Sequence, residues 1–153
     1  MTMNKRQLTL DEQLIEEQNV VSEVIEFYQT DRDFKKIIYD DWTAQDVLGH
    51  ITSWHMSFER NLLSAVQKEK PKPFSGTLTD VNEREVKKMA QYSIPELLAA
   101  IKKAQETIDL NIKNSEVTEI AYKRGSRNYS PLEHLEIVQR HLRTHLKDLQ
   151  AKY

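Results

Sequence analysis

Four long stretches of the sequence carry apolar residues every three or four positions, and each follows a residue that favours a helix start. Three of the starting residues, Thr9, Ser93 and Ser130, have a glutamate three positions later, and such pairs satisfy free N–H groups of a first helical turn. The fourth, Thr43, is an N-cap, and Asp46 in the first turn suits the positive end of the helix dipole. We therefore predict four long helices, at residues 9–29, 44–68, 93–111 and 130–152, and a shorter helix at 81–91.

The spacing of these helices predicts an all-α fold, a four-helix bundle formed by a single domain over residues 1–153. Only 3 glycines and 4 prolines occur in 153 residues, so hairpin turns are scarce. We expect the connector at 31–42 to pack inward as a short turn of helix and 71–80 to form a loop. The segment at 114–129 is expected to be irregular, with a strand-like crossover in VTEIAY.

Composition narrows the classes of function. The net charge is −2 with both signs spread along the chain, which argues against nucleic-acid binding. No cysteine is present, so disulfides, thiolate metal ligands and an internal thiol nucleophile are excluded. The N-terminal residues lack the apolar core of a signal peptide, and no run is apolar enough for a membrane span. We expect a cytoplasmic protein without a membrane partner.

Three histidines are the candidate metal ligands. His141 and His145 lie four positions apart in the predicted helix at 130–152, so both imidazoles share one face. His50 lies about 10 Å from the start of its own helix, and the pair lies roughly 10–15 Å from the end of theirs. Antiparallel packing of the two helices would bring all three to one height. We predict a divalent metal site, the alternative being ordinary half-buried histidines, because one HxxxH spacing is a weak signal.

Other polar residues near these ligands have two interpretations. Asp46 and Asp148 each lie one turn from a predicted ligand, and could accept a hydrogen bond from an imidazole or simply favour helix ends and solvent. Trp54 is expected in the core or in a pocket wall. His134 is expected at the surface or pocket rim, and His55, five positions from His50, is expected to point elsewhere.

Three neutral imidazoles would leave at least one metal position open, as in catalytic rather than structural zinc sites. Such an ion could lower the pKa of bound water or activate an incoming thiol. Because the chain has no cysteine, the thiol would come from a small cosubstrate. The basic turn Lys123, Arg124 and Arg127 is either solvated or holds a carboxylate of substrate or cosubstrate.

The segment DWTAQDVLGHITSWH, followed far downstream by HLRTHL, resembles the DinB superfamily of metal-dependent four-helix proteins. The matching positions are Trp42, Asp46, Val47, Leu48 and His50, then His141 and His145. The segment beginning at Asn82 and the helix start at 93–97 are also similar. The resemblance covers most of the chain, although its specific content is the three histidines.

The resemblance implies an up-down-down-up bundle, a divalent metal such as zinc or nickel, and a homodimer. It also implies a thiol-dependent transferase acting on a small-molecule substrate, while the open ligand position leaves a metal-dependent hydrolase as the other enzyme. A bundle that binds a small molecule or a partner, with a structural or adventitious metal, is the alternative. An open ligand position facing a pocket would favour an enzyme, whereas a fourth protein ligand would favour a structural site.

Overall fold

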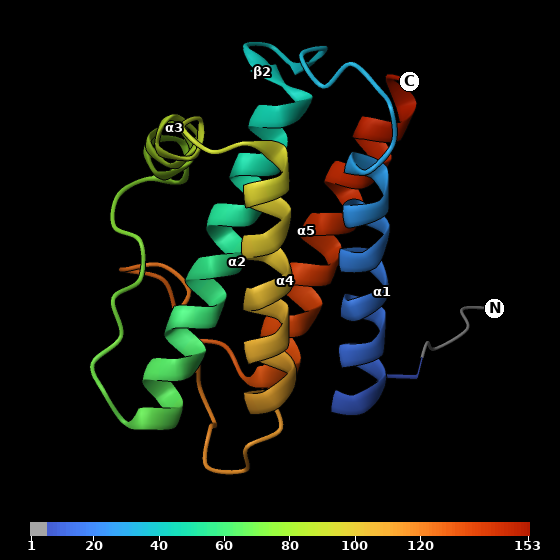
Figure 1. Ribbon diagram of the computed structural model, residues 1–153. Helices are drawn as coiled ribbons and strands as arrows, with labels where there is room; N and C mark the ends of the chain where they lie inside the picture. The colour runs from blue at the N-terminus through green and yellow to red at the C-terminus, as the bar shows by residue number, and fades with distance from the viewer. Residues whose placement is uncertain (1–5) are drawn as a thin grey trace, which may run out of the picture.

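A computed structural model describes residues 6–153 (Figure 1). In this part of the chain there are five α-helices and one two-stranded antiparallel sheet. In chain order they are α1 (Leu10–Tyr28), β1 (Ile37–Tyr39), β2 (Trp42–Thr43), α2 (Ala44–Gln67), α3 (Leu78–Met89), α4 (Ile94–Asn111) and α5 (Pro131–Ala151).

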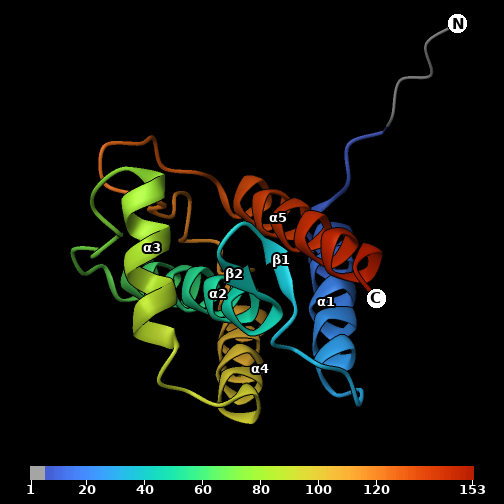
Figure 2. The same cartoon turned by 90° about the horizontal axis from the view of Figure 1, so that it is seen from above.

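Helices α1, α2, α4 and α5 form the bundle, and α3 lies outside it against α2 (Figures 1 and 2). In Figure 1, α1 and α5 run upward and α2 and α4 run downward, so the order is up-down-down-up. This confirms the predicted fold class, an all-α four-helix bundle with up-down-down-up topology. Gly49 allows the close approach of α3, because a Cβ at that position would lie 3.0 Å from Cβ of Met89.

The helix starts are those that the sequence predicts. Each long helix begins with a capping box in which the hydroxyl accepts from the N3 amide and the acid accepts from the cap amide: Thr9 with Glu12, Thr43 with Asp46, Ser93 with Glu96, and Ser130 with Glu133. The short helix α3 begins three residues earlier than expected, because Thr77 supplies its N-cap. These hydrogen bonds are local in sequence, so they fix where each helix begins without the help of long-range contacts.

The apolar core is divided unevenly among the helices. α2 packs most extensively against α4, and α1 against α5, whereas α2 and α5 meet over a smaller area. Buried side chains of both pairs join in one cluster at the upper end, which includes Val47, Ile51, Leu97, Ile101 and Leu146. The looser α2–α5 interface leaves space for polar groups between two well-packed layers.

Two connecting segments differ from the predictions. The connector before α2 is a β-hairpin, not a turn of helix: β1 and β2 pair around Asp40, whose φ of 26° suits a tight turn. The segment VTEIAY forms no strand, but Ile120 makes an isolated antiparallel bridge with Tyr129. Over the described residues, no helix is both long enough and apolar enough to cross a membrane.

Candidate metal centre

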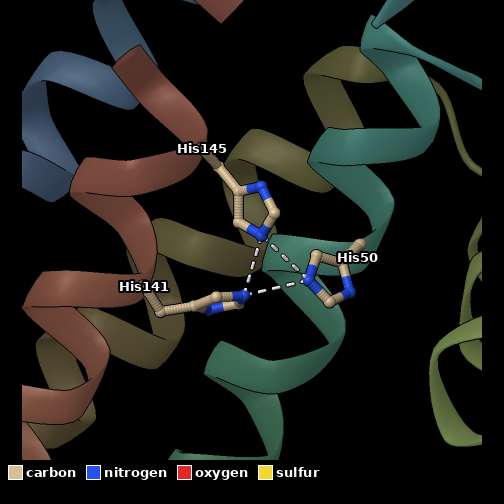
Figure 3. A group of neighbouring side chains, drawn as sticks. All are labelled: His50, His141 and His145. Carbon is tan, nitrogen blue, oxygen red and sulfur yellow. Dashed lines mark hydrogen bonds between the residues drawn. The ribbon is translucent and has the colours of Figure 1, made fainter. Parts of the chain in front are cut away.

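Three imidazoles meet between α2 and α5 (Figure 3). His141 and His145 project from successive turns of α5, and His50 faces them from the antiparallel α2. Nε2 of His141 lies 2.9 Å from Nε2 of both other residues, and the third Nε2–Nε2 separation, between His50 and His145, is 3.2 Å. We call this group the histidine triad.

Burial keeps the triad uncharged. His50 is 4% exposed, and burial, followed by the neighbouring imidazoles, lowers its pKa to about 2. Burial and the imidazole of His145 lower the pKa of His141 to about 3. The pKa of His145 is lowered by burial, although the nearby carboxylate of Asp148 opposes the change. Neutral imidazoles are the form that binds a metal, so no proton has to be displaced near neutral pH.

Tyr39 and Asp148 set the orientation of His145. The Tyr39 hydroxyl donates to Oδ2 of Asp148 at 2.5 Å, and its oxygen lies 2.9 Å from Nδ1 of His145. A hydroxyl has one hydrogen and a carboxylate only accepts, so the Tyr39 oxygen accepts from Nδ1–H of His145. This places the lone pair of His145 on Nε2, toward the other two imidazoles. Burial, followed by the Asp148 hydrogen bond, raises the pKa of Tyr39 and keeps the hydroxyl protonated.

The triad suits one divalent cation. Each Nε2–Nε2 separation is shorter than two metal–nitrogen bonds of about 2.0–2.1 Å, so a single ion can contact all three nitrogens. Without a cation, the three Nε2 atoms can be joined only by hydrogen bonds. The Nε2 of His145 has a lone pair and no hydrogen, and each of the other two imidazoles has at most one N–H to donate. Within residues 6–153, no fourth His, Asp or Glu joins the cluster, so the residues present leave ligand positions open.

A cavity of about 350 Å³ opens beside the triad, between α2 and α5. All five histidines and both tryptophans of the chain line it. Its other walls are mainly apolar and aromatic, with Phe58 and Tyr122 among them, and none of the described residues that line it is a Lys, Arg, Asp or Glu. The cavity is therefore a neutral, aromatic space with the histidine triad at one end.

The sequence places Asp46, Asp148 and Trp54 near the metal ligands, and the structure gives each of them a different position. Asp46 accepts from the amide of Thr43 at 2.9 Å and caps α2, and it borders a different, smaller cavity. Asp148 reaches His145 only through Tyr39. Trp54 lines the main cavity, where its Nε1 donates to Oδ1 of Asn82 at 2.8 Å.

His134 lies deeper in the protein than predicted, and the basic turn lies away from the cavity. His134, predicted at the surface or the pocket rim, does line the cavity but is buried in its wall: it is 3% exposed and packs against Phe58, with ring centroids 4.0 Å apart. The basic turn does not line the cavity. There Lys123 donates to the carbonyl of Gly76, and Arg127 pairs with Glu133 at 2.8 Å. Both basic groups are thus engaged on the surface.

Tyr39 is the residue that sequence analysis missed. It lies 106 residues before His145, in a connector that shows no helical or strand periodicity. The only available signal is an aromatic hydroxyl four positions before Thr43, the cap of α2. That position alone does not indicate which helix the side chain reaches.

Together, the topology and the open histidine triad define an up-down-down-up helical bundle with a candidate metal centre. Searches against protein-family models and against curated proteins find no match. Among solved structures, the chain is similar to the mycothiol-dependent maleylpyruvate isomerase, with 15% identity and a TM-score of 0.75, and to a histidine-to-alanine mutant of it, with 15% identity and a TM-score of 0.72. Each alignment covers 93% of this chain but only 61% of the other, so the chain spans about three-fifths of those proteins.

Proposed function

We propose that the protein is a metal-dependent enzyme in which His50, His141 and His145 hold one divalent cation, zinc or nickel, beside a small-molecule pocket. The observation that carries this proposal is the open three-histidine cluster at the end of a cavity of about 350 Å³. A closed structural site would need a fourth protein ligand, and within the described residues none is close enough.

A bound divalent cation supplies Lewis acidity, which lowers the pKa of a coordinated thiol or water. The chain's own residues do the rest. The histidines present neutral nitrogens, and Tyr39 with Asp148 holds His145 in the required tautomer. The mainly apolar and aromatic walls of the cavity would hold the apolar body of a small molecule beside the triad.

We favour a low-molecular-weight thiol as the cosubstrate, in a thiol-dependent transferase or isomerase. The fold neighbours include an enzyme described as mycothiol-dependent, and this chain has no cysteine of its own to act as nucleophile. The second candidate is a hydrolase that uses water at the same site, because the open position accepts either nucleophile. A non-catalytic binding bundle is the remaining alternative.

Metal analysis of untagged protein is the first experiment. We expect about one equivalent of zinc or nickel, lost on chelation and restored on addition. The chelated protein is then loaded with Co²⁺ and titrated with small thiols, while the absorption spectrum is followed. A sulfur-to-cobalt charge-transfer band supports the thiol-dependent enzyme. No band with any thiol, together with thiol-independent ester or amide cleavage, supports the hydrolase, and stoichiometric metal with neither activity supports a binding protein.

A homodimer, a cytoplasmic location and a single domain over residues 1–153 stay predictions. For the homodimer, the structure offers a candidate face on α1 and α4, where two apolar side chains are exposed: Ile15 is 54% exposed and Leu110 is 85% exposed. Light scattering should give twice 18.0 kDa if this face pairs. A single species of 18.0 kDa would contradict the dimer.

A further inference from the structure

The end of the cavity away from the triad contains buried polar groups without partners. His134 is 3% exposed and Asn61 is 2% exposed. Both line the cavity, and neither ring nitrogen of His134 nor Oδ1 of Asn61 makes a hydrogen bond of normal geometry to any described residue. Leaving such groups unpaired in a folded protein is costly, so they are usually paired or hydrated. We call His134 and Asn61 the distal polar pair.

The distal pair is well separated from the triad. Seven residues of α5 separate His134 from His141, which is about 10 Å at 1.5 Å per residue. Asn61 lies eleven residues beyond His50 on α2, about 16 Å along the axis. Because the two helices are antiparallel, both residues of the distal pair lie toward the same end of the cavity. A ligand that extends from the triad along the cavity would reach them.

The chemistry of the distal pair selects a neutral group. Burial lowers the pKa of His134 to about 4, and nearby backbone groups, first its own and then that of Ala121, oppose part of this change. The ring is therefore neutral near pH 7 and has one donor and one acceptor. Asn61 has its Nδ2 directed at Oγ of Ser57, at 3.4 Å, so its free atom is the acceptor Oδ1. An incoming carboxylate would meet this acceptor and no cationic side chain among the residues that line the cavity.

We propose that the distal polar pair is a specificity site, which binds a neutral head group with an N–H or O–H donor, such as a primary amide, at the far end of a small molecule with an apolar body. That this molecule is the substrate or cosubstrate rests on the proposed function. Its binding at the distal pair does not, because the pair lies outside the triad.

Three matched probes test the proposal: 4-phenylbutanamide, 5-phenyl-2-pentanone and 4-phenylbutanoate. They have the same size and body and differ in whether the end group is amide, ketone or carboxylate. Both tryptophans line the cavity, so their fluorescence reports binding. In chelated protein we expect the amide to bind about tenfold more tightly than the ketone, and the carboxylate to bind most weakly. Equal binding of amide and ketone would overturn the proposal, because it would leave water as the partner of the pair.

Two asparagines that line the same cavity provide matched variants. Asn61→Leu should remove the preference for the amide over the ketone with little change in Tm, because Oδ1 has no partner and Nδ2 makes only the 3.4 Å contact with Oγ of Ser57. Asn82→Leu should lower Tm, since Oδ1 of Asn82 accepts from Trp54, but should keep the preference. The reverse pattern would make Asn61 a structural residue and overturn the proposal.

A second measurement uses the wild-type chain, in case Asn61→Leu does not fold. In ¹⁵N NMR spectra, the amide probe should shift the signals of the Asn61 side chain and the His134 ring more than the ketone does. Loading with Zn²⁺ separates this proposal from the proposed function. A preference for the amide without metal binding would support the distal site and contradict the metal-dependent enzyme. Metal binding without a preference for the amide would support the metal-dependent enzyme and contradict the distal site.

Discussion

The two ends of the cavity are built from the same residue type but satisfied in different ways. At the triad end, His50, His141 and His145 approach one another within 3.2 Å, and Tyr39 with Asp148 fixes one of them. At the distal end, neither ring nitrogen of His134 makes a hydrogen bond of normal geometry to a described residue. Our two proposals follow this difference: a cation that three neutral nitrogens can share at one end, and a neutral molecule with hydrogen-bonding groups of its own at the other.

The largest effect is expected from truncation of the triad. Replacing His141 with Ala should weaken zinc binding by more than about 100-fold, because loss of a direct ligand exceeds the 10–100-fold typical of an outer-shell partner. Competition with a chromophoric chelator gives the affinity. His134→Gln is the matched control, since it changes a histidine of the same helix and cavity and should leave zinc affinity unchanged. Equal losses in both variants would place the metal elsewhere.

Tyr39→Phe should have the next largest effect. The variant keeps the ring but removes the hydroxyl that accepts from His145 and donates to Asp148, so zinc affinity should fall about 10–100-fold. Asp148→Asn should cost less, and the double variant should lose little more than Tyr39→Phe, because both act through one hydrogen-bonded chain. The tautomer of His145, read from its ring ¹⁵N shifts, should become mixed in the chelated Tyr39→Phe protein. An unchanged tautomer with lower affinity would mean that Tyr39 acts through packing alone.

The distal end should be visible in the dependence of stability on pH. Burial lowers the pKa of His134 to about 4 from an ordinary value near 6.5, so between these pH values the unfolded chain binds a proton that the folded chain does not. Stability is therefore complete above about pH 6.5 and decreases as the pH falls, by about 2 kcal/mol for this group at pH 5. Urea unfolding of chelated protein at pH 7.5 and 5.0 should show a pH effect about 2 kcal/mol smaller in His134→Phe. An unchanged pH effect would show that His134 is protonated in the folded protein.

How far the sequence predicts this molecule depends on the range of each interaction. The helix starts were predicted because each capping box lies within four residues, as in Ser130 with Glu133. The sequence does not predict the hairpin before α2, because its strands have only three and two residues and depend on distant contacts. One is the hydrogen bond from the Tyr28 hydroxyl to the carbonyl of Ala44, and another links Tyr39 to α5.

The same limit applies to the site. The spacing of His141 and His145 predicts that they share one face of α5, and the antiparallel direction of α2 predicts that His50 lies at the same height. Both predictions follow from regular helix geometry. The sequence does not predict the burial of His134. The side chains that cover it are Phe58 of α2 and Tyr122 of the irregular segment before α5, both distant in the sequence. Spacing within one helix identifies a shared face, but only the neighbouring elements decide whether a polar group on that face has a partner.

The smallest expected effect separates the two aspartates that lie one turn from a ligand. Asp46 accepts from the amide of Thr43 and makes no hydrogen bond with the triad, so Asp46→Ala should lower the free energy of unfolding by about 1 kcal/mol, as loss of a helix-capping hydrogen bond does. Zinc affinity should not change, whereas Asp148→Asn should change zinc affinity and leave the helix start of α2 intact. Urea unfolding and chelator competition on both variants measure the two effects. Reduced zinc affinity in Asp46→Ala would show that the start of α2 also positions His50, one turn further along the helix.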